Sequence, residues 1–230
     1  MPLNDLRPIA DRALENRRST TDIVVTVLRD AIVTGLLQAG EELNQVELAR
    51  QFRISRVPVR EAIRLLEAEG LVVSPLHRRT VVSALTPSLL GELFDVRMYI
   101  ESVALGAAVP RLQLVDLADL EALVTRMEGE GDHRTWMRLN DQFHDTLYRP
   151  SGKEFVCLLI RQLRQNVERY FWASGHSVRR SREANAEHRR ILEACRVGDV
   201  ARAQEALKIH LTATRNILTS TLRVTRKEEA

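Results

Sequence analysis

Apolar residues recur at intervals of three and four over nearly the whole of this 230-residue chain. That spacing places them along one side of an α-helix. Residues 71–73 and 80–82 are short runs of the kind found in strands, and a polar, basic loop lies between them. From Thr86 onward every segment fits a helix, and prolines and glycines divide this half into about six helices. The sequence therefore predicts a mainly α fold.

The region 19–84 contains the pattern helix, helix, turn, helix and two strands. Its first helix follows a Ser-Thr-Thr cap, and Asn44 and Glu47 have the spacing of a capping box at the start of a second, short helix. Ser55 caps the third helix, which tolerates proline in its first turn. Two strands with a basic tip form a wing beside these helices. The region is predicted to be a winged helix-turn-helix domain.

The remaining regions are an N-terminal arm, residues 1–18, with no assigned function, and an all-helical bundle, residues 86–225. No apolar run approaches the roughly 20 residues of a membrane span, and the start lacks a secretory signal, so we expect a cytosolic protein without a membrane helix. Cys157 and Cys195 do not form a metal or disulfide pattern and are interpreted as buried thiols. We expect the bundle's aromatic residues to be core or pocket wall, namely Tyr99, Trp136, Phe143, Tyr170, Phe171 and Trp172.

Positive charge is concentrated in the helix-turn-helix. Residues 50–79 contain seven arginines and three glutamates, whereas the whole chain has a net charge of only +3. In this motif the N-terminal residues of the second helix enter the DNA major groove, and an arginine fork can bind guanine or a phosphate. Arg56 and Arg60 share one helix face, and Ser55 can anchor a phosphate. The alternative is a solvated basic helix. The candidate DNA contacts are Arg53, Ser55, Arg56, Arg60 and Arg64, together with His77, Arg78 and Arg79 in the wing.

Histidines of the helical half have a spacing that can build a metal site. Asn140 and His144 are four residues apart and share one helix face. His188 lies 10 residues before the turn at Gly198-Asp199 and His210 lies 12 after the glycine, so on antiparallel helices the two stand almost level. Three imidazoles and an amide oxygen can then converge on a divalent ion. A lone helix histidine is more often a surface or hydrogen-bonded residue, so the spacing alone leaves both interpretations open.

The first half resembles a known family of regulators. The segment SRVPVREAIRLLEAEGLV, residues 55–72, resembles the signature of GntR-type winged helix regulators, and so does LRDAIVTGLLQAGEEL, residues 28–43. This resemblance implies DNA contacts from Ser55, Arg56, Arg60 and the wing. The chain departs from the family pattern at Ala39, where proline is usual, and in the wing, which lacks the usual glycine.

The second half is similar to the FCD domain, the helical effector domain of FadR-type GntR regulators. The similarity rests on LFDVRMYIE (93–101), NDQFHDTLY (140–148), EHRRILEA (187–194) and residues 198–211. It implies a divalent metal, such as zinc, nickel or manganese, on Asn140, His144, His188 and His210. Many members have aspartate where this chain has Asn140, and Lys153 replaces a usual asparagine. The resemblance also implies that Arg97 binds an effector carboxylate, although its spacing to Glu101 equally fits an ion pair within the helix.

These observations predict a homodimeric, ligand-responsive regulator that binds an inverted repeat of double-stranded DNA and a small organic acid. Two alternatives belong to other classes. A metal-dependent hydrolase would use the three histidines to activate water, but no H-E-x-x-H motif or obvious general base accompanies them. An architectural DNA-binding protein would use its helical half only to dimerise and would not respond to an effector.

Overall fold

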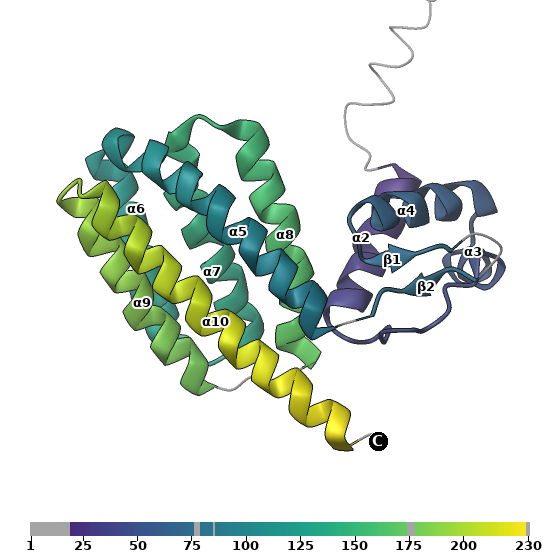
Figure 1. Ribbon diagram of the computed structural model, residues 1–230. Coiled ribbons are helices and arrows are strands. Elements are labelled where there is room, and N and C mark those ends of the chain that lie inside the picture. Colours follow the sequence, from purple (N-terminus) through teal and green to yellow (C-terminus); the bar gives the residue numbers. More distant parts are fainter. Residues whose placement is uncertain (1–18, 76–78, 85, 174–177, 229–230) are drawn as a thin grey trace, which may run out of the picture. The chain divides into compact units, whose positions relative to one another are not determined.

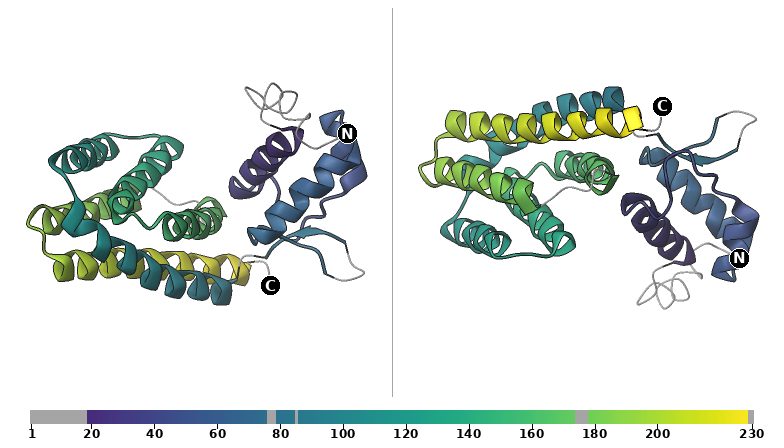
Figure 2. Two further views of the ribbon diagram at one scale, coloured as in Figure 1. Left: turned by 90° about the horizontal axis from the view of Figure 1, so that it is seen from above. Right: turned by 90° about the horizontal axis from the view of Figure 1, so that it is seen from below.

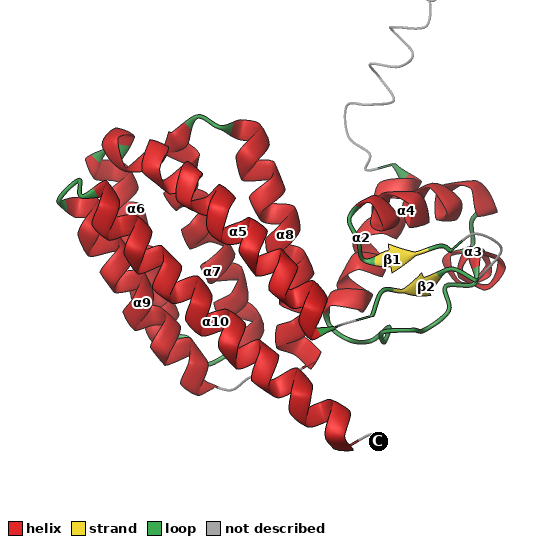
Figure 3. Cartoon of the chain, in the orientation of Figure 1, coloured by secondary structure: helices red, strands yellow, loops and turns green. Residues whose placement is uncertain are grey.

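The computed structural model describes residues 19–75, 79–84, 86–173 and 178–228. The predicted arm, residues 1–18, lies outside the described residues. The chain divides into two compact units between residues 84 and 85. Helices dominate both units and a small sheet occurs in the first (Figure 3), which confirms the mainly α prediction. No described helix has the length and apolar character needed to cross a lipid bilayer.

The described residues of the first unit form three helices and a two-stranded wing (Figure 1). Its elements are α2 (Thr20–Val33), α3 (Gln45–Phe52), α4 (Arg56–Ala68), β1 (Val72–Val73) and β2 (Val81–Val82). The apolar sides of the helices and strands form one buried cluster that includes Val24, Leu28, Ile32, Val59, Ile63, Leu66, Leu71 and Val82. The helix-turn-helix and the wing therefore share one hydrophobic core.

The wing strands are antiparallel, with Val72 opposite Val82 and Val73 opposite Val81. Val81 also forms an isolated antiparallel bridge with Glu42, in the segment between α2 and α3. The sequence did not predict this third extended segment, because one bridging residue has no periodicity. The bridge ties the base of the wing to the helix-turn-helix.

Helix caps account for the element boundaries, with two corrections. Ser19 and Asp22 form a complete capping box at the start of α2. Asn44 caps α3 through its side-chain oxygen, but Glu47 does not close the predicted box, because its carboxylate binds arginine and glutamine side chains one turn further along α3. Ser55 occupies the N-cap position of α4, yet its hydroxyl makes no capping hydrogen bond. That hydroxyl is exposed at the N-terminus of α4.

The second unit consists of packed helices joined by short turns. Helix α10 lies along α5 and also contacts α9, while α6 contacts α7 and α9, and α8 contacts α5 (Figures 1 and 2). The predicted breaks separate the helices α5 (Pro87–Ala108), α6 (Leu114–Glu128), α7 (His133–Tyr148), α8 (Glu154–Ala173), α9 (Val178–Arg196) and α10 (Val200–Glu228). Because these helices pack together, segments that are 60 or more residues apart in the sequence surround one interior.

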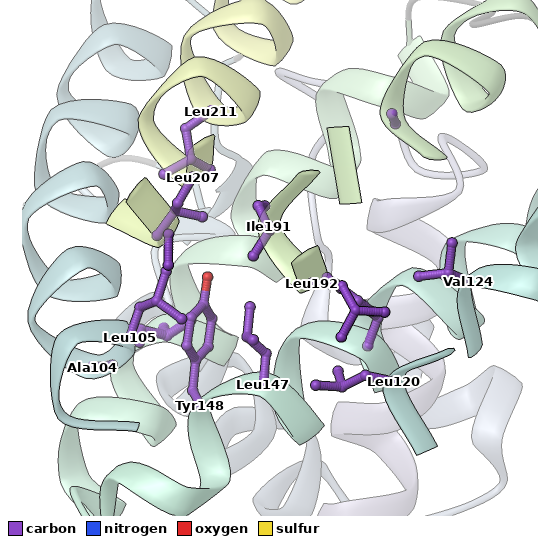
Figure 4. Close-up of a cluster of buried hydrophobic side chains, with 14 of the residues drawn as sticks. Ala104, Leu105, Leu120, Val124, Leu147, Tyr148, Ile191, Leu192, Leu207 and Leu211 are labelled. Carbon is purple, nitrogen blue, oxygen red and sulfur yellow. The ribbon is translucent and has the colours of Figure 1, made fainter. Parts of the chain in front are cut away.

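Aliphatic side chains from these helices fill that interior, and Figure 4 shows part of the cluster. Leu105 of α5, Leu120 of α6, Leu147 of α7, Ile191 of α9 and Leu207 of α10 are all buried. Of the predicted core aromatics, Trp136, Phe143 and Tyr170 are buried and Phe171 is partly buried, whereas the side chain of Trp172 is not described.

Two burial predictions were wrong. Tyr99 is 74% exposed, because it lies on the outer side of α5, and the spacing of aromatics does not reveal which side of a helix is covered. Cys157 is only partly buried, and its thiol donates to the carbonyl oxygen of Tyr148 at 3.6 Å. Cys195 is buried as expected, and burial raises the pKa of its thiol to about 12.

Candidate functional site

The first candidate site is the exposed side of α4. The buried residues of this helix, Val59, Ala62, Ile63 and Leu66, face the core, whereas Arg56, Arg60 and Arg64 project to solvent at intervals of four. No ion pair occupies these three side chains among the described residues. Together they form an unpaired basic strip that begins at the helix N-terminus.

The neighbouring predicted contacts have different surroundings. Arg53 is exposed and ends α3 with a left-handed backbone, at φ 56°, which turns the chain toward α4. Arg79 is exposed but pairs with Glu42 at 2.5 Å, so a DNA phosphate would compete with that carboxylate. His77 and Arg78 lie outside the described residues.

The second candidate site is a buried cluster of three histidines in the second unit. His144 of α7, His188 of α9 and His210 of α10 each offer a ring nitrogen within 4.8 Å of the others. The ring centroids of His188 and His210 are 4.7 Å apart, as their equal heights above the α9–α10 turn predicted. This spacing is that of ligands around one metal ion.

Hydrogen bonds fix which nitrogen two of these rings present. The Nδ1 atom of His210 lies 2.7 Å from a carboxylate oxygen of Glu187. A carboxylate only accepts, so Nδ1 carries a proton, and in the neutral imidazole Nε2 keeps its lone pair. The imidazole of His210 is thereby oriented by a carboxylate, an arrangement common behind metal-binding histidines.

A longer relay fixes His144 in the same tautomer. The hydroxyl of Tyr148 donates to Glu101 at 2.7 Å, and Glu101 also accepts from Nε of Arg97 at 2.7 Å. Because the phenol has one hydrogen, its oxygen can only accept from Nδ1 of His144, which lies 3.3 Å away. Nε2 of His144 is then the nitrogen with a lone pair.

The protonation state agrees with this assignment. Burial, followed by the charge of Arg164 and by the other two histidines, holds the pKa of His144 well below its usual range. Burial and the Glu101 carboxylate raise the pKa of Tyr148, so the phenol keeps its proton. The neutral imidazole of His144 is therefore held in place, through Tyr148, by the charged pair of Arg97 and Glu101.

Asn140 completes the predicted ligand set. Its side-chain oxygen is buried and accepts no hydrogen bond from the described residues. Buried oxygens of this kind normally have a partner, so this one is suited to a ligand that the protein atoms do not supply. The three imidazoles and this amide oxygen fit the preferences of a divalent ion.

A cavity of about 40 Å³ adjoins the cluster and is lined by Asn140, His144 and His210. Arg97 and Arg164 line the same cavity. Arg97 forms the predicted ion pair with Glu101 through Nε, and its two terminal nitrogens make no hydrogen bond within the described part of the chain. The two interpretations of Arg97 are thus compatible, since one side chain can hold Glu101 and face the cavity.

Sequence reasoning missed Tyr148, Glu187 and Arg164 as supporting residues, and it missed the link from Glu101 to Tyr148. Tyr148 lies four residues after His144, and Glu101 lies four residues after Arg97. That spacing places each pair on one helix face and was the available sequence signal. Glu187 precedes His188 directly but serves His210, and nothing in its sequence position indicates this. The remaining residue is Arg164 of α8, which donates to the backbone oxygen of Asn140 at 3.2 Å and to Asp141 at 2.5 Å.

Comparison with known proteins places both units. Residues 20–82 match the family described as bacterial regulatory proteins, gntR family, and residues 92–213 match the FCD domain. The chain is 28% identical over 191 residues to the HTH-type transcriptional regulator YdhC of Bacillus subtilis, covering 81% of this chain and 83% of YdhC. It is 29% identical over 182 residues to the gluconate operon transcriptional repressor of Bacillus licheniformis, covering 77% and 73%.

The fold has solved counterparts as well. McbR of Escherichia coli has a TM-score of 0.75 at 24% identity, over 90% of this chain and 100% of McbR. These families and relatives are regulators of transcription and not enzymes, so the hydrolase alternative is wrong. The chain therefore belongs to the gntR family of bacterial regulatory proteins, as a DNA-binding transcriptional regulator whose second unit is an FCD domain.

Proposed function

We propose that this regulator is a cytosolic, homodimeric repressor that senses a small organic acid through a divalent metal ion in its FCD domain. The observation that carries the proposal is the cluster of His144, His188 and His210 beside a cavity lined by Arg97. A structural cluster of histidines would not need a cavity with an arginine in its wall.

The proposed metal ligands are Nε2 of His144, Nε2 of His210, His188 and the side-chain oxygen of Asn140. Neutral imidazoles with an amide oxygen suit zinc, nickel or manganese. A metal held this way keeps coordination positions for an exogenous ligand, and its chemistry is to attract a carboxylate oxygen as a Lewis acid.

The organic acid would bind between the metal and Arg97. Nε of Arg97 is already committed to Glu101, which holds the guanidinium in place, and its terminal nitrogens can donate to a carboxylate. A carboxylate that reaches both groups is fixed at two points. This requirement selects small acids over neutral molecules of similar size.

The proposed DNA contacts are the basic strip of Arg56, Arg60 and Arg64, with Ser55, Arg53 and the wing residues His77, Arg78 and Arg79. A dimer would place two copies of α4 on the half-sites of an inverted repeat. Acid binding would change DNA affinity by favouring one arrangement of the dimer over another. Repression is supported by the name of the gluconate operon repressor among the relatives.

The test begins with selection of bound duplexes from a random DNA pool by the purified protein. We expect an inverted repeat, and an operator affinity that changes when zinc and a small carboxylic acid are added together. The variant His144→Ala should bind the same operator and lose the response to zinc and acid. If the wild type shows no response to any acid with any of the three metals, the sensor proposal is wrong and the architectural alternative stands.

A further inference from the structure

The ligand set in the FCD domain brings no negative charge of its own. An imidazole that binds a metal ion through Nε2 and keeps its proton on Nδ1 is neutral, and the hydrogen bonds at Nδ1 of His144 and His210 leave Nε2 for that role, while Asn140 offers an amide oxygen. A divalent ion bound here would retain its two positive charges. In a site this deeply buried, an uncompensated charge is strongly unfavourable.

No carboxylate of the described residues joins the three histidines in the cluster, although Glu168 and Asp141 also line the cavity. Glu101 is fully buried, but it is already neutralised by Arg97 at 2.7 Å. Asp141 forms a 2.5 Å pair with Arg164. Glu187 contacts Nδ1 of His210, so it lies behind a proposed ligand and can offset one positive charge at most.

The cavity offers a place for the missing anion. It borders Asn140, His144 and His210 on one side and Arg97 on another. An anion there would touch the metal directly and accept hydrogen bonds from the terminal nitrogens of Arg97. Direct contact compensates charge far better than a carboxylate held behind a ligand.

We propose that metal and organic acid bind this domain cooperatively, because the acid supplies the anionic ligand that Asn140 does not. The metal alone binds weakly, and the acid alone binds weakly, but each strengthens the other by the same factor. The regulator then responds only when both are present. This inference rests on the proposed metal and acid site and adds the coupling between its two ligands.

Calorimetric titration of zinc into the metal-free, full-length protein measures the coupling. Zinc affinity is measured in sodium nitrate and then, at equal ionic strength, in acetate, lactate or succinate. Couplings between ligand sites are typically about 5- to 150-fold, and we expect an increase of this size in zinc affinity with the acid that fits the cavity.

The matched variant is Asn140→Asp, which has nearly the same shape and supplies one negative charge. We expect it to bind zinc in nitrate alone more tightly than the wild type does, and to gain less from the acid. Wild-type affinity in nitrate that equals that of Asn140→Asp would overturn the inference while leaving the metal site in place. If neither protein binds zinc under any condition, the proposed metal site itself is wrong, which is a different failure.

Discussion

Tyr148 connects the histidine cluster to Arg97 through Glu101, and its hydroxyl is the most informative single group to remove. The variant Tyr148→Phe keeps the buried ring and its packing but loses two hydrogen bonds. One of them runs to Glu101 at 2.7 Å and the other comes from His144 at 3.3 Å. The change leaves a buried carboxylate oxygen and a buried imidazole N–H without these partners.

The cost follows from the character of the two bonds. A hydrogen bond to a charged group contributes about 1.5–3 kcal/mol and a neutral one about 0.5–1.5 kcal/mol. We therefore expect the free energy of unfolding of the helical unit to fall by about 2–4 kcal/mol. Loss of the group that orients a metal-binding histidine should also weaken zinc affinity by about 10- to 100-fold.

Urea denaturation followed by tryptophan fluorescence measures the first effect, because both tryptophans, Trp136 and Trp172, belong to the helical unit. The control is Tyr99→Phe, the same chemical change at a 74% exposed position, which should alter the free energy of unfolding by less than about 0.5 kcal/mol. If Tyr148→Phe matches this control in both stability and zinc affinity, the relay does not support the site.

Three further predictions concern other parts of the chain. The double variant R56A/R60A should lose specific operator binding in fluorescence anisotropy, and retained specificity near physiological salt would contradict the assignment. Burial raises the pKa of Cys195 to about 12, so iodoacetamide should label this thiol near neutral pH only after unfolding, and rapid labelling of Cys195 itself in the native protein, distinguished from Cys157 by peptide mass, would disprove its burial. A backbone N–H at Gln113 and then an arginine lower the pKa of Asp116 below its ordinary value of 3.8. The stabilisation by this carboxylate is therefore complete above pH 3.8 and is lost as pH falls through the lowered pKa. The difference in free energy of unfolding between the wild type and Asp116→Asn should then disappear in acid and should not grow.

Regular helix geometry explains what could be predicted from the sequence. The level position of His188 and His210 followed from the rise per residue on both sides of one turn, and their ring centroids are 4.7 Å apart. Asn140 and His144 share a face for the same reason. The helices of the winged helix-turn-helix were predicted from apolar spacing and from caps such as those at Ser19 and Asn44.

Contacts that depend on how the helices pack in three dimensions could not be predicted from helix geometry. Glu187 binds His210 on the neighbouring helix α10, because α9 and α10 pack with that register. Arg164 reaches Asn140 from α8, which no local pattern indicates. Tyr99 has the spacing of a core residue but lies on the outer side of α5.

The central claim is that the three buried histidines hold a metal ion. Equilibrium dialysis of the full-length protein against zinc and the carboxylic acid, followed by elemental analysis, measures this directly. The account predicts about one zinc ion per chain in the wild type and its loss in His188→Ala, with circular dichroism showing that the variant remains helical. A wild type that holds no zinc, or a folded His188→Ala variant that holds as much as the wild type, would contradict it.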